Sequence, residues 1–312
     1  MTDPKPSISV VVPVYFAERT LIALVEQLHA FLSEVAEKYE VLLVNDGSTD
    51  GSWAVIQQLS QQYDFVRGFN FMRNFGQHNA LLCGIRNARY DLTVTMDDDL
   101  QHNPHSIADM LEEMHKGYDV VYGSPKEEKH GLMRDLASII TKMTLSTVMR
   151  TKNARHVSAL RLFYTRLREA FENYDGPSVS IDVLLSWGTS RIGYVEVEHH
   201  ERKEGESHYT FAKLVSHALN MITGFSTLPL RISTAVGFFL TLFGIGILIY
   251  VFINYLINGG AVPGFTFMTS VITIFSGAQL FSLGILGEYF SRMYQRSMNR
   301  PSYIVKEKTS DQ

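Results

Sequence analysis

Three consecutive carboxylates, Asp97, Asp98 and Asp99, stand directly after a short apolar run at residues 92–96, and Gln101 follows closely. The run has the composition of a β-strand, and ligands of open α/β sheets bind beyond the carboxyl ends of the strands. Carboxylates crowded at such a point repel one another unless a cation neutralises them. Mg²⁺ takes oxygen ligands from one or two carboxylates and completes its shell with substrate phosphates. The stretch therefore predicts a site for a metal ion and a diphosphate.

A simpler interpretation is an acidic loop that caps the helix expected near His105, because acidic N-caps are common. For an isolated run of three aspartates this interpretation is favoured. The polar residues at the other strand ends make the capping interpretation less favoured here.

Strand-like and helix-like segments alternate along the first two thirds of the chain. Strands are expected at 8–14, 41–44, 66–71, 92–96 and 119–122, with later ones at 155–164 and 192–198. Helices are expected at about 20–35, after residue 50, and at about 79–88, 105–115 and 179–187. This alternation predicts an α/β fold whose mostly parallel sheet is covered by helices on both faces.

Polar residues follow three of these strands. The first strand ends at Pro13–Tyr15, the second at Asp46, and the fourth at the aspartate run. Tyr15 is suited to stacking on a base, and Asp46 to accepting a hydrogen bond from a base N–H or a ribose hydroxyl. Each residue alone is more often an ordinary turn residue. Together, at one sheet edge, they predict a cleft for a nucleotide and a metal ion.

The last third of the chain carries two long uncharged runs, Ile232–Ile257 and Phe265–Leu286. At 1.5 Å per residue they extend about 39 Å and about 33 Å, enough to cross a ~30 Å hydrocarbon core. Arg231 precedes the first run, and Arg292, Arg296 and Arg300 follow the second, whereas the short connection has no Lys or Arg. The positive-inside rule then predicts a transmembrane hairpin with both ends in the cytoplasm. A pair of buried core helices is disfavoured by these lengths.

Composition excludes other classes. The chain of 312 residues has 28 Lys and Arg against 32 Asp and Glu, a net charge of −4, so nucleic acid is not an expected partner. A single cysteine, Cys83, allows no internal disulfide and fits a reducing compartment. The N-terminus shows no secretory signal.

Six segments carry a family resemblance: VVVPVY, VLLVNDGSTDGS, RNFGQHNAL, MDDDLQHNP, HHERKEGESHYTF and LGEYFSRMYQRSMNRPSYIV. The chain resembles a family-two glycosyltransferase with a GT-A (Rossmann-like) fold, in the polyprenyl-phosphate branch. That branch includes dolichol-phosphate mannose synthases and bacterial undecaprenyl-phosphate (bactoprenol) glycosyltransferases. The resemblance covers essentially the whole chain. The combination of segments is specific, whereas the DXD-type loop alone is not.

The resemblance implies a domain organisation. Residues 1–228 would be a cytoplasmic GT-A domain with interfacial amphipathic helices at about 132–150 and 210–228. For the first of these, a core helix is the alternative. Residues 229–290 would be the two-helix transmembrane hairpin, and residues 291–312 a cytoplasmic tail. The enzyme would sit in the cell inner membrane and assemble as a homo-oligomer.

The resemblance also implies an activity and its residues. One sugar would pass from a nucleotide-diphosphate sugar to a polyprenyl phosphate with inversion, using Mg²⁺ or Mn²⁺. The nucleotide sugar would contact Pro13, Tyr15, Asp46, Asp97 and Asp98. The metal would be held by Asp99 and Gln101 with help from Asp97. Phosphate or acceptor would contact Arg73, His78, Arg202, Gly205, Ser207 and His208.

Three positions depart from the family. Ala17 stands where a Glu is usual, so a base contact is lost or shifts to Glu18. His208 replaces the usual Lys, and Ala159 replaces an Asp that relatives use as catalytic base. A phosphate monoester has a second pKa of about 6, so a lipid phosphate acceptor needs little deprotonation to attack.

Two aspartates remain as candidate catalytic residues, Asp98 and Asp182. For Asp182, a plain position on a helix surface is the favoured interpretation. Two other functions stay open. A processive polysaccharide synthase would show a QxxRW-type motif and more membrane spans. A non-catalytic membrane scaffold is suggested by Phe16, Ala17 and Ala159 and opposed by the intact aspartate run.

Overall fold

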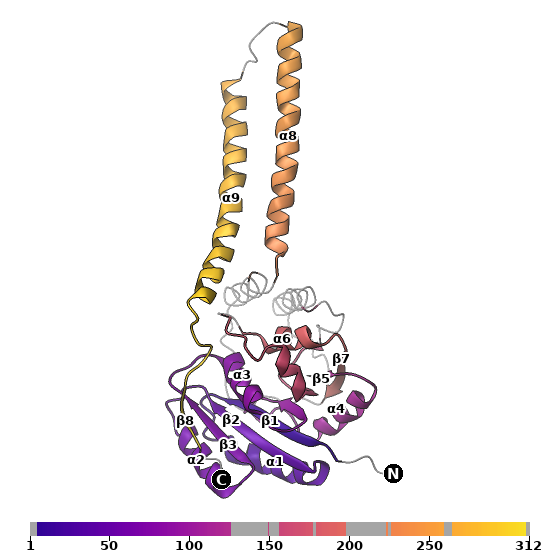
Figure 1. Cartoon of the computed structure of the whole chain (residues 1–312), viewed down its shortest axis with the longest axis vertical. Helices are drawn as coiled ribbons and strands as arrows, with labels where there is room; N and C mark the ends of the chain where they lie inside the picture. The colour runs from indigo at the N-terminus through magenta and orange to yellow at the C-terminus, as the bar shows by residue number, and fades with distance from the viewer. Residues whose placement is uncertain are drawn as a thin grey trace. The chain divides into compact units, whose positions relative to one another are not determined.

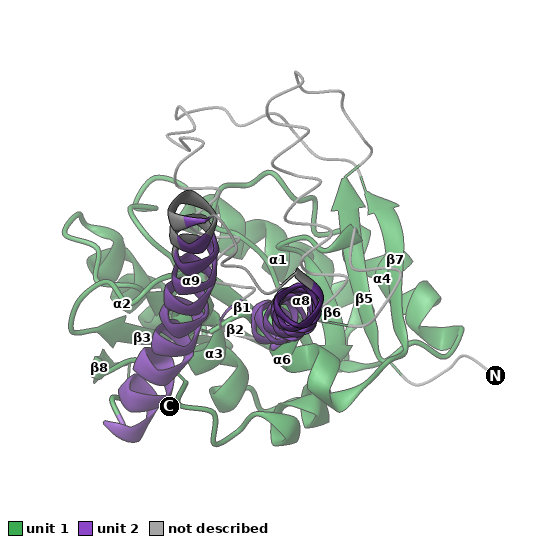
Figure 2. Ribbon diagram, turned by 90° about the horizontal axis from the view of Figure 1, so that it is seen from above, with its two compact units in different colours: residues 1–215, 300–312 green, residues 216–299 purple. Residues whose placement is uncertain are grey.

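The computed structural model describes residues 5–125, 149, 156–176, 179–197, 223, 226–258 and 264–309. The chain divides into two compact units, residues 1–215 with 300–312, and residues 216–299. Figure 2 colours them green and purple. The chain leaves the first unit once and returns to it with its last residues.

The first unit is built on one sheet with the strand order β7-β5-β6-β4-β1-β2-β3-β8. Its strands are β1 (Ser7–Val14), β2 (Lys38–Asn45), β3 (Val66–Phe71), β4 (Leu92–Thr95), β5 (Val120–Pro125), β6 (Arg161–Tyr164), β7 (Ile192–Val197) and β8 (Val305–Lys308). The four central strands β4, β1, β2 and β3 are parallel, and β5 pairs in parallel with β7. β6 runs antiparallel between β4 and β5, and β8 runs antiparallel to β3. The predicted α/β fold with a mostly parallel sheet is confirmed.

Helices cover both faces of this sheet (Figure 1). They are α1 (Leu21–Val35), α2 (Ser52–Gln62), α3 (Gln77–Asn87), α4 (Ser106–His115), the 3₁₀ helix η2 (Thr165–Ala170) and α6 (Ile181–Gly188). Val10 and Val12 of β1 belong to one core with apolar side chains of α1, α2 and α4. Val11 faces α3, where a Cβ on Gly84 would collide with it. Burial on both faces explains why β1 reads as a continuous apolar run.

The second unit contains two helices that pack together, α8 (Leu228–Asn258) and α9 (Phe265–Ser297). Among the described residues, Leu228–Ile257 is the one helical stretch that is long and apolar enough to cross a membrane, and none of its apolar window is buried. The second predicted span, Phe265–Leu286, lies within α9 and stays a prediction. The predicted interfacial helices at 132–150 and 210–228 lie almost entirely outside the described residues.

Candidate active site

Four parallel neighbouring strands end at the same edge of the sheet and bring the predicted residues together. β1 leads to Tyr15, β2 to Asp46, β3 to the loop that begins at Met72, and β4 to the aspartate run. Register pairs Pro13 with Val44 and Val14 with Asn45, so the ends of β1 and β2 are level. The predicted convergence of the first, second and fourth strand ends is confirmed, and the end of β3 joins them.

Side chains from other loops hold the loop after β1. Three consecutive amides of this loop each donate a hydrogen bond to a side-chain oxygen: Tyr15 to Asp98 Oδ2 (3.1 Å), Phe16 to Ser48 Oγ (3.1 Å) and Ala17 to Ser52 Oγ (3.0 Å). Glu18 Oε2 accepts from the Gly51 amide at 3.0 Å. The expected shift of a base contact to Glu18 therefore competes with a structural contact to the start of α2.

Phe16 adopts a left-handed backbone conformation with φ of 57°. Its ring is 54% exposed and meets the Tyr15 ring edge-on, with centroids 4.5 Å apart. A bulky residue in this conformation is strained, and such strain is typical of functional sites. The three anchored amides supply the constraint that keeps it there.

Asp46 is buried, with 3% of its surface exposed. Its two carboxylate oxygens accept from successive amides of the loop after β3, Oδ1 from Phe75 at 2.7 Å and Oδ2 from Gly76 at 2.8 Å. Burial raises the pKa of Asp46 above its ordinary value, and these two hydrogen bonds and Arg73 oppose the rise. Each oxygen keeps a second lone pair for a ligand.

The aspartate run does not cap α4. The N-cap residue of α4 is His105, and it makes no side-chain cap hydrogen bond. Asp97 Oδ1 instead accepts from Gln77 Nε2 at 2.6 Å, and Asp99 Oδ1 accepts from the Gln101 amide at 3.2 Å. The capping interpretation of these carboxylates is therefore wrong.

Burial raises the pKa of Asp98 to about 6, and the neighbouring charges of Asp97 and Asp99 add to the rise. A cation placed among these carboxylates would relieve that repulsion. Within the described residues, no three His, Cys, Asp or Glu side chains form a metal cluster by themselves. The predicted set has two carboxylates and an amide, which suits Mg²⁺ or Mn²⁺ when substrate phosphate completes the shell. The oxygen donors thus fit the predicted ion.

Asp182 is not a surface residue, and this alternative is wrong. It is 5% exposed at the start of α6. Arg161 of β6 donates to both its oxygens, from Nε to Oδ1 at 2.6 Å and from Nη2 to Oδ2 at 3.1 Å, and the Tyr122 hydroxyl donates to Oδ1. Burial alone would raise the pKa of Asp182, but the charge and hydrogen bonds of Arg161 outweigh it and hold the pKa below its ordinary value. A carboxylate in this ion pair is a poor proton acceptor.

Of the remaining predicted residues, three lie in the described part of the chain and four outside it. Arg73 places its guanidinium 4.1 Å from the Phe75 ring centroid at the exposed end of β3, and His78 Nδ1 accepts from the Ile181 amide at 3.3 Å. Pro13 is buried within β1. Arg202, Gly205, Ser207 and His208 lie outside the described residues, so their predicted role stays a prediction.

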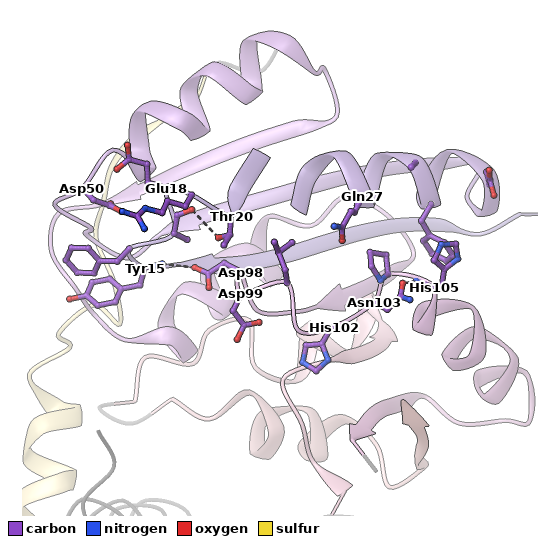
Figure 3. A pocket seen from close by; sticks show the side chains of 18 residues that line it. Tyr15, Glu18, Thr20, Gln27, Asp50, Asp98, Asp99, His102, Asn103 and His105 are labelled. Atoms are coloured by element: carbon purple, nitrogen blue, oxygen red, sulfur yellow. Dashed lines mark hydrogen bonds between the residues drawn. The ribbon is translucent and has the colours of Figure 1, made fainter. Parts of the chain in front are cut away.

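A cavity of about 1490 Å³ opens beside the aspartate run. Its wall comes from the loop after β1, from α1, from Asp50 and from residues 98–100 and 102–105. Figure 3 shows Asp98 and Asp99 side by side in this wall, with Tyr15 next to Asp98. The cavity gives a ligand room next to Asp99, the one predicted metal residue in its lining.

Comparisons with known proteins identify the family. Residues 9–172 match the model of glycosyl transferase family 2. The chain belongs to glycosyl transferase family 2. Residues 228–293 of this glycosyltransferase match the GtrB C-terminal hairpin, a second family model that corresponds to the second unit. The predicted family and enzyme class are confirmed.

Curated relatives are similar over the whole length of this glycosyltransferase. Undecaprenyl-phosphate 4-deoxy-4-formamido-L-arabinose transferase of Serratia proteamaculans (strain 568) is 32% identical over 99% of this chain and 96% of its own length. The protein of the same name from Photorhabdus laumondii is 30% identical over 97% of this chain and 94% of its own.

A solved structure confirms the GT-A fold. Glucosyl-3-phosphoglycerate synthase from Mycobacterium tuberculosis, in complex with Mn²⁺, UDP-glucose and phosphoglyceric acid, has a TM-score of 0.52 to this chain. The similarity covers 70% of this chain and 78% of that chain at 16% identity. At this identity it shows the fold alone.

Sequence reasoning missed several residues of the site. Ser48 and Ser52 lie in the NDGSTDGS segment, and both hydroxyls accept hydrogen bonds from amides of the loop after β1. Gln77 contacts Asp97 from the first residue of α3. Their position in segments that resemble the family was the available signal, but it did not indicate which partner each residue contacts.

Proposed function

We propose that this glycosyltransferase transfers one sugar from a nucleotide-diphosphate sugar to a polyprenyl phosphate at the cytoplasmic face of a membrane, with inversion and with Mg²⁺ or Mn²⁺. The observation that carries the proposal is the combination, in one chain, of a carboxylate-lined strand edge and an apolar hairpin. Full-length relatives named undecaprenyl-phosphate transferases support undecaprenyl phosphate as the acceptor.

The donor would lie across the four strand ends. Tyr15 would contact the base, and Asp46 would accept from the base or the ribose. Pro13 is buried within β1, so a contact of its side chain with the base is not proposed. Asp97, Asp99 and Gln101 would hold the ion, which as a Lewis acid would stabilise charge on the leaving nucleoside diphosphate. A mycobacterial synthase of the same fold is known in complex with Mn²⁺ and UDP-glucose, which supports a divalent ion together with a nucleotide sugar in general.

The acceptor would need little help from a base. Its phosphate is largely dianionic at neutral pH, because its second pKa is about 6. This explains how Ala159 can replace the catalytic Asp of relatives. Arg73 and His78, with Arg202, Gly205, Ser207 and His208, would contact the acceptor or the diphosphate. Asp98 remains the candidate for proton transfer, whereas Asp182 is better suited to holding Arg161 in place.

The hairpin would anchor the enzyme as two spans. Arg231 before α8 and the arginines that follow residue 290 favour both ends in the cytoplasm, and the inner membrane is then the expected location. Arg134, Arg150 and Arg231 would attract the anionic head group. A homo-oligomer is expected from the family resemblance.

The test is turnover of the purified protein in detergent with undecaprenyl phosphate and a panel of UDP-, GDP- and dTDP-sugars. The panel includes the nucleotide-activated 4-deoxy-4-formamido-L-arabinose that the names of the relatives specify. Reactions run with Mg²⁺, Mn²⁺ or EDTA, with Asp99→Ala, and with Asp109→Ala as a control for an exposed aspartate on α4.

One monoglycosylated lipid, lost with EDTA and in Asp99→Ala but retained in Asp109→Ala, is the expected result. Long polymer would favour the processive synthase. Donor hydrolysis without glycolipid would contradict the lipid acceptor. Failure to bind any nucleotide or metal would favour the scaffold.

A further inference from the structure

The segment after the hairpin is a part of the catalytic unit. β8 pairs antiparallel with the edge strand β3, with Phe71 opposite Val305 and Phe69 opposite Lys308. Hydrogen bonds continue beyond the pairing: the Met72 amide donates to the Ile304 carbonyl at 3.0 Å, and the Gly68 amide donates to Thr309 Oγ1 at 2.8 Å. In Figure 2 these last residues share the green of the first unit. The segment covers an edge that would otherwise expose unpaired backbone groups.

Aromatic rings connect Tyr303 of this segment to the sheet edge where Asp46 lies. Its ring stacks on Phe71, with centroids 5.1 Å apart and planes 8° apart. Phe71, 2% exposed, meets the Phe75 ring edge-on at 5.7 Å. The Phe75 amide donates to Asp46 Oδ1 at 2.7 Å. A continuous series of packed rings therefore runs from Tyr303 to the loop that holds the Asp46 carboxylate.

The loop that carries Phe75 lies against the loop that carries Asp46. Gly76 has φ of 97°, and the space where a Cβ would point is open for 4 Å, so no side chain packs against the loop from that direction. A Cβ on Gly47, next to Asp46, would collide with the backbone of Arg73 and Asn74. The two loops are thus in close contact, and a displacement of residues 73–76 would move Asp46.

We propose that Tyr303 is a positioning residue for the donor site, and that the segment beyond the hairpin completes that site by fixing the loop around Asp46. The proposal rests on the proposed function, because Asp46 is expected to contact the nucleotide there. Aromatic pairs of this kind contribute measurably beyond the area that they bury. Loss of the Tyr303 ring should therefore loosen residues 73–76 and weaken donor binding, while the chemical step at saturating donor continues.

The experiment compares Tyr303→Leu with Tyr303→Phe in the full-length protein in detergent. Trp53→Phe is the matched control, because Trp53 Nε1 donates to Glu307 Oε2 at 2.9 Å and so holds the same segment without touching the stacked rings. Tyr303→Leu should raise the donor KM about three- to ten-fold with kcat nearly unchanged. Tyr303→Phe and Trp53→Phe should keep the wild-type donor KM.

A second measurement does not depend on turnover. Hydrogen–deuterium exchange of the peptide covering residues 71–79 should be faster in Tyr303→Leu than in wild type, because the Phe75 and Gly76 amides are held less firmly. If Tyr303→Leu does not fold, Phe75→Leu breaks the same series of rings from its other end and should show the same rise in donor KM.

Unchanged exchange and donor KM in Tyr303→Leu would overturn the proposal, as would an equal rise in Trp53→Phe, which would indicate general docking of the segment. If wild type turns over no nucleotide sugar, the proposed function fails. The exchange measurement still decides whether Tyr303 positions the loop.

Discussion

The buried ion pair between Arg161 and Asp182 allows a quantitative test. Their side chains are 6% and 7% exposed, and both carboxylate oxygens are bound by the guanidinium. Removal of one partner leaves an uncompensated buried charge, which costs about 3–5 kcal/mol of unfolding free energy. Asp182→Leu and Arg161→Met should therefore each lower the melting temperature of the catalytic unit by roughly 6–20 °C.

The double variant should recover most of this loss. With both charges gone, the Tyr122 hydroxyl loses its acceptor, and an unsatisfied buried hydroxyl costs about 1–3 kcal/mol. Thr95 Oγ1 and the Ala159 carbonyl lose the hydrogen bonds from Arg161 Nη1 but keep the one between them. The coupling energy of the cycle should thus exceed about 3 kcal/mol. Thermal and denaturant unfolding in detergent, followed by near-UV circular dichroism, measures all four proteins. Costs that simply add in the double variant would refute the reasoning.

A different substitution of the same aspartate, Asp182→Asn, tests catalysis. A general base contributes about 10²–10⁴-fold to the rate, so Asp182→Asn should lower kcat by that factor if Asp182 accepts the proton. We expect a change of kcat smaller than about ten-fold in the folded enzyme, because the pKa of Asp182 is lowered and its oxygens are bound. That lowered pKa also means that its stabilising contribution is present above about pH 4 and lost only as pH falls through the folded value. The effect on stability should therefore be constant between pH 6 and 8.

Three further predictions concern other residues. Burial raises the pKa of Asp98 to about 6, so its contribution to the stability of the metal-free protein is present below about pH 4 and is lost as the pH rises through 6. Thermal melts between pH 4 and pH 7 should show this fall in stability. The Asp98→Asn variant should lack the pH dependence. Phe16→Gly should relieve the left-handed backbone strain and raise the unfolding free energy by about 1 kcal/mol, which thermal melts would measure; a lower stability would contradict the strain. Burial raises the pKa of the Cys83 thiol to about 12, so Ellman's reagent at pH 8 should label it only after denaturant is added.

Local pattern was sufficient for much of the fold. The spacing of apolar residues distinguished the strands of the central sheet from helix α1. Strands and helices each show a characteristic spacing over a few neighbouring residues, so this signal can be found in the sequence. Parallel strands share one edge for their carboxyl ends, so Tyr15, Asp46 and the aspartate run could be placed together before any contact was known. The length of the uncharged run in α8 likewise depends on composition alone.

Pairing and packing between segments far apart in the sequence were decided by the tertiary structure. β6 enters between β4 and β5 in the antiparallel direction, and β8 returns from the end of the chain to pair with β3. Sequence reasoning left the last residues as a tail, because a short strand that pairs across more than two hundred residues has no local signature. Asp182 shows the same limit. Its polar side chain at the start of a helix suggests solvent, and only the packing of α6 against β6 buries it on Arg161.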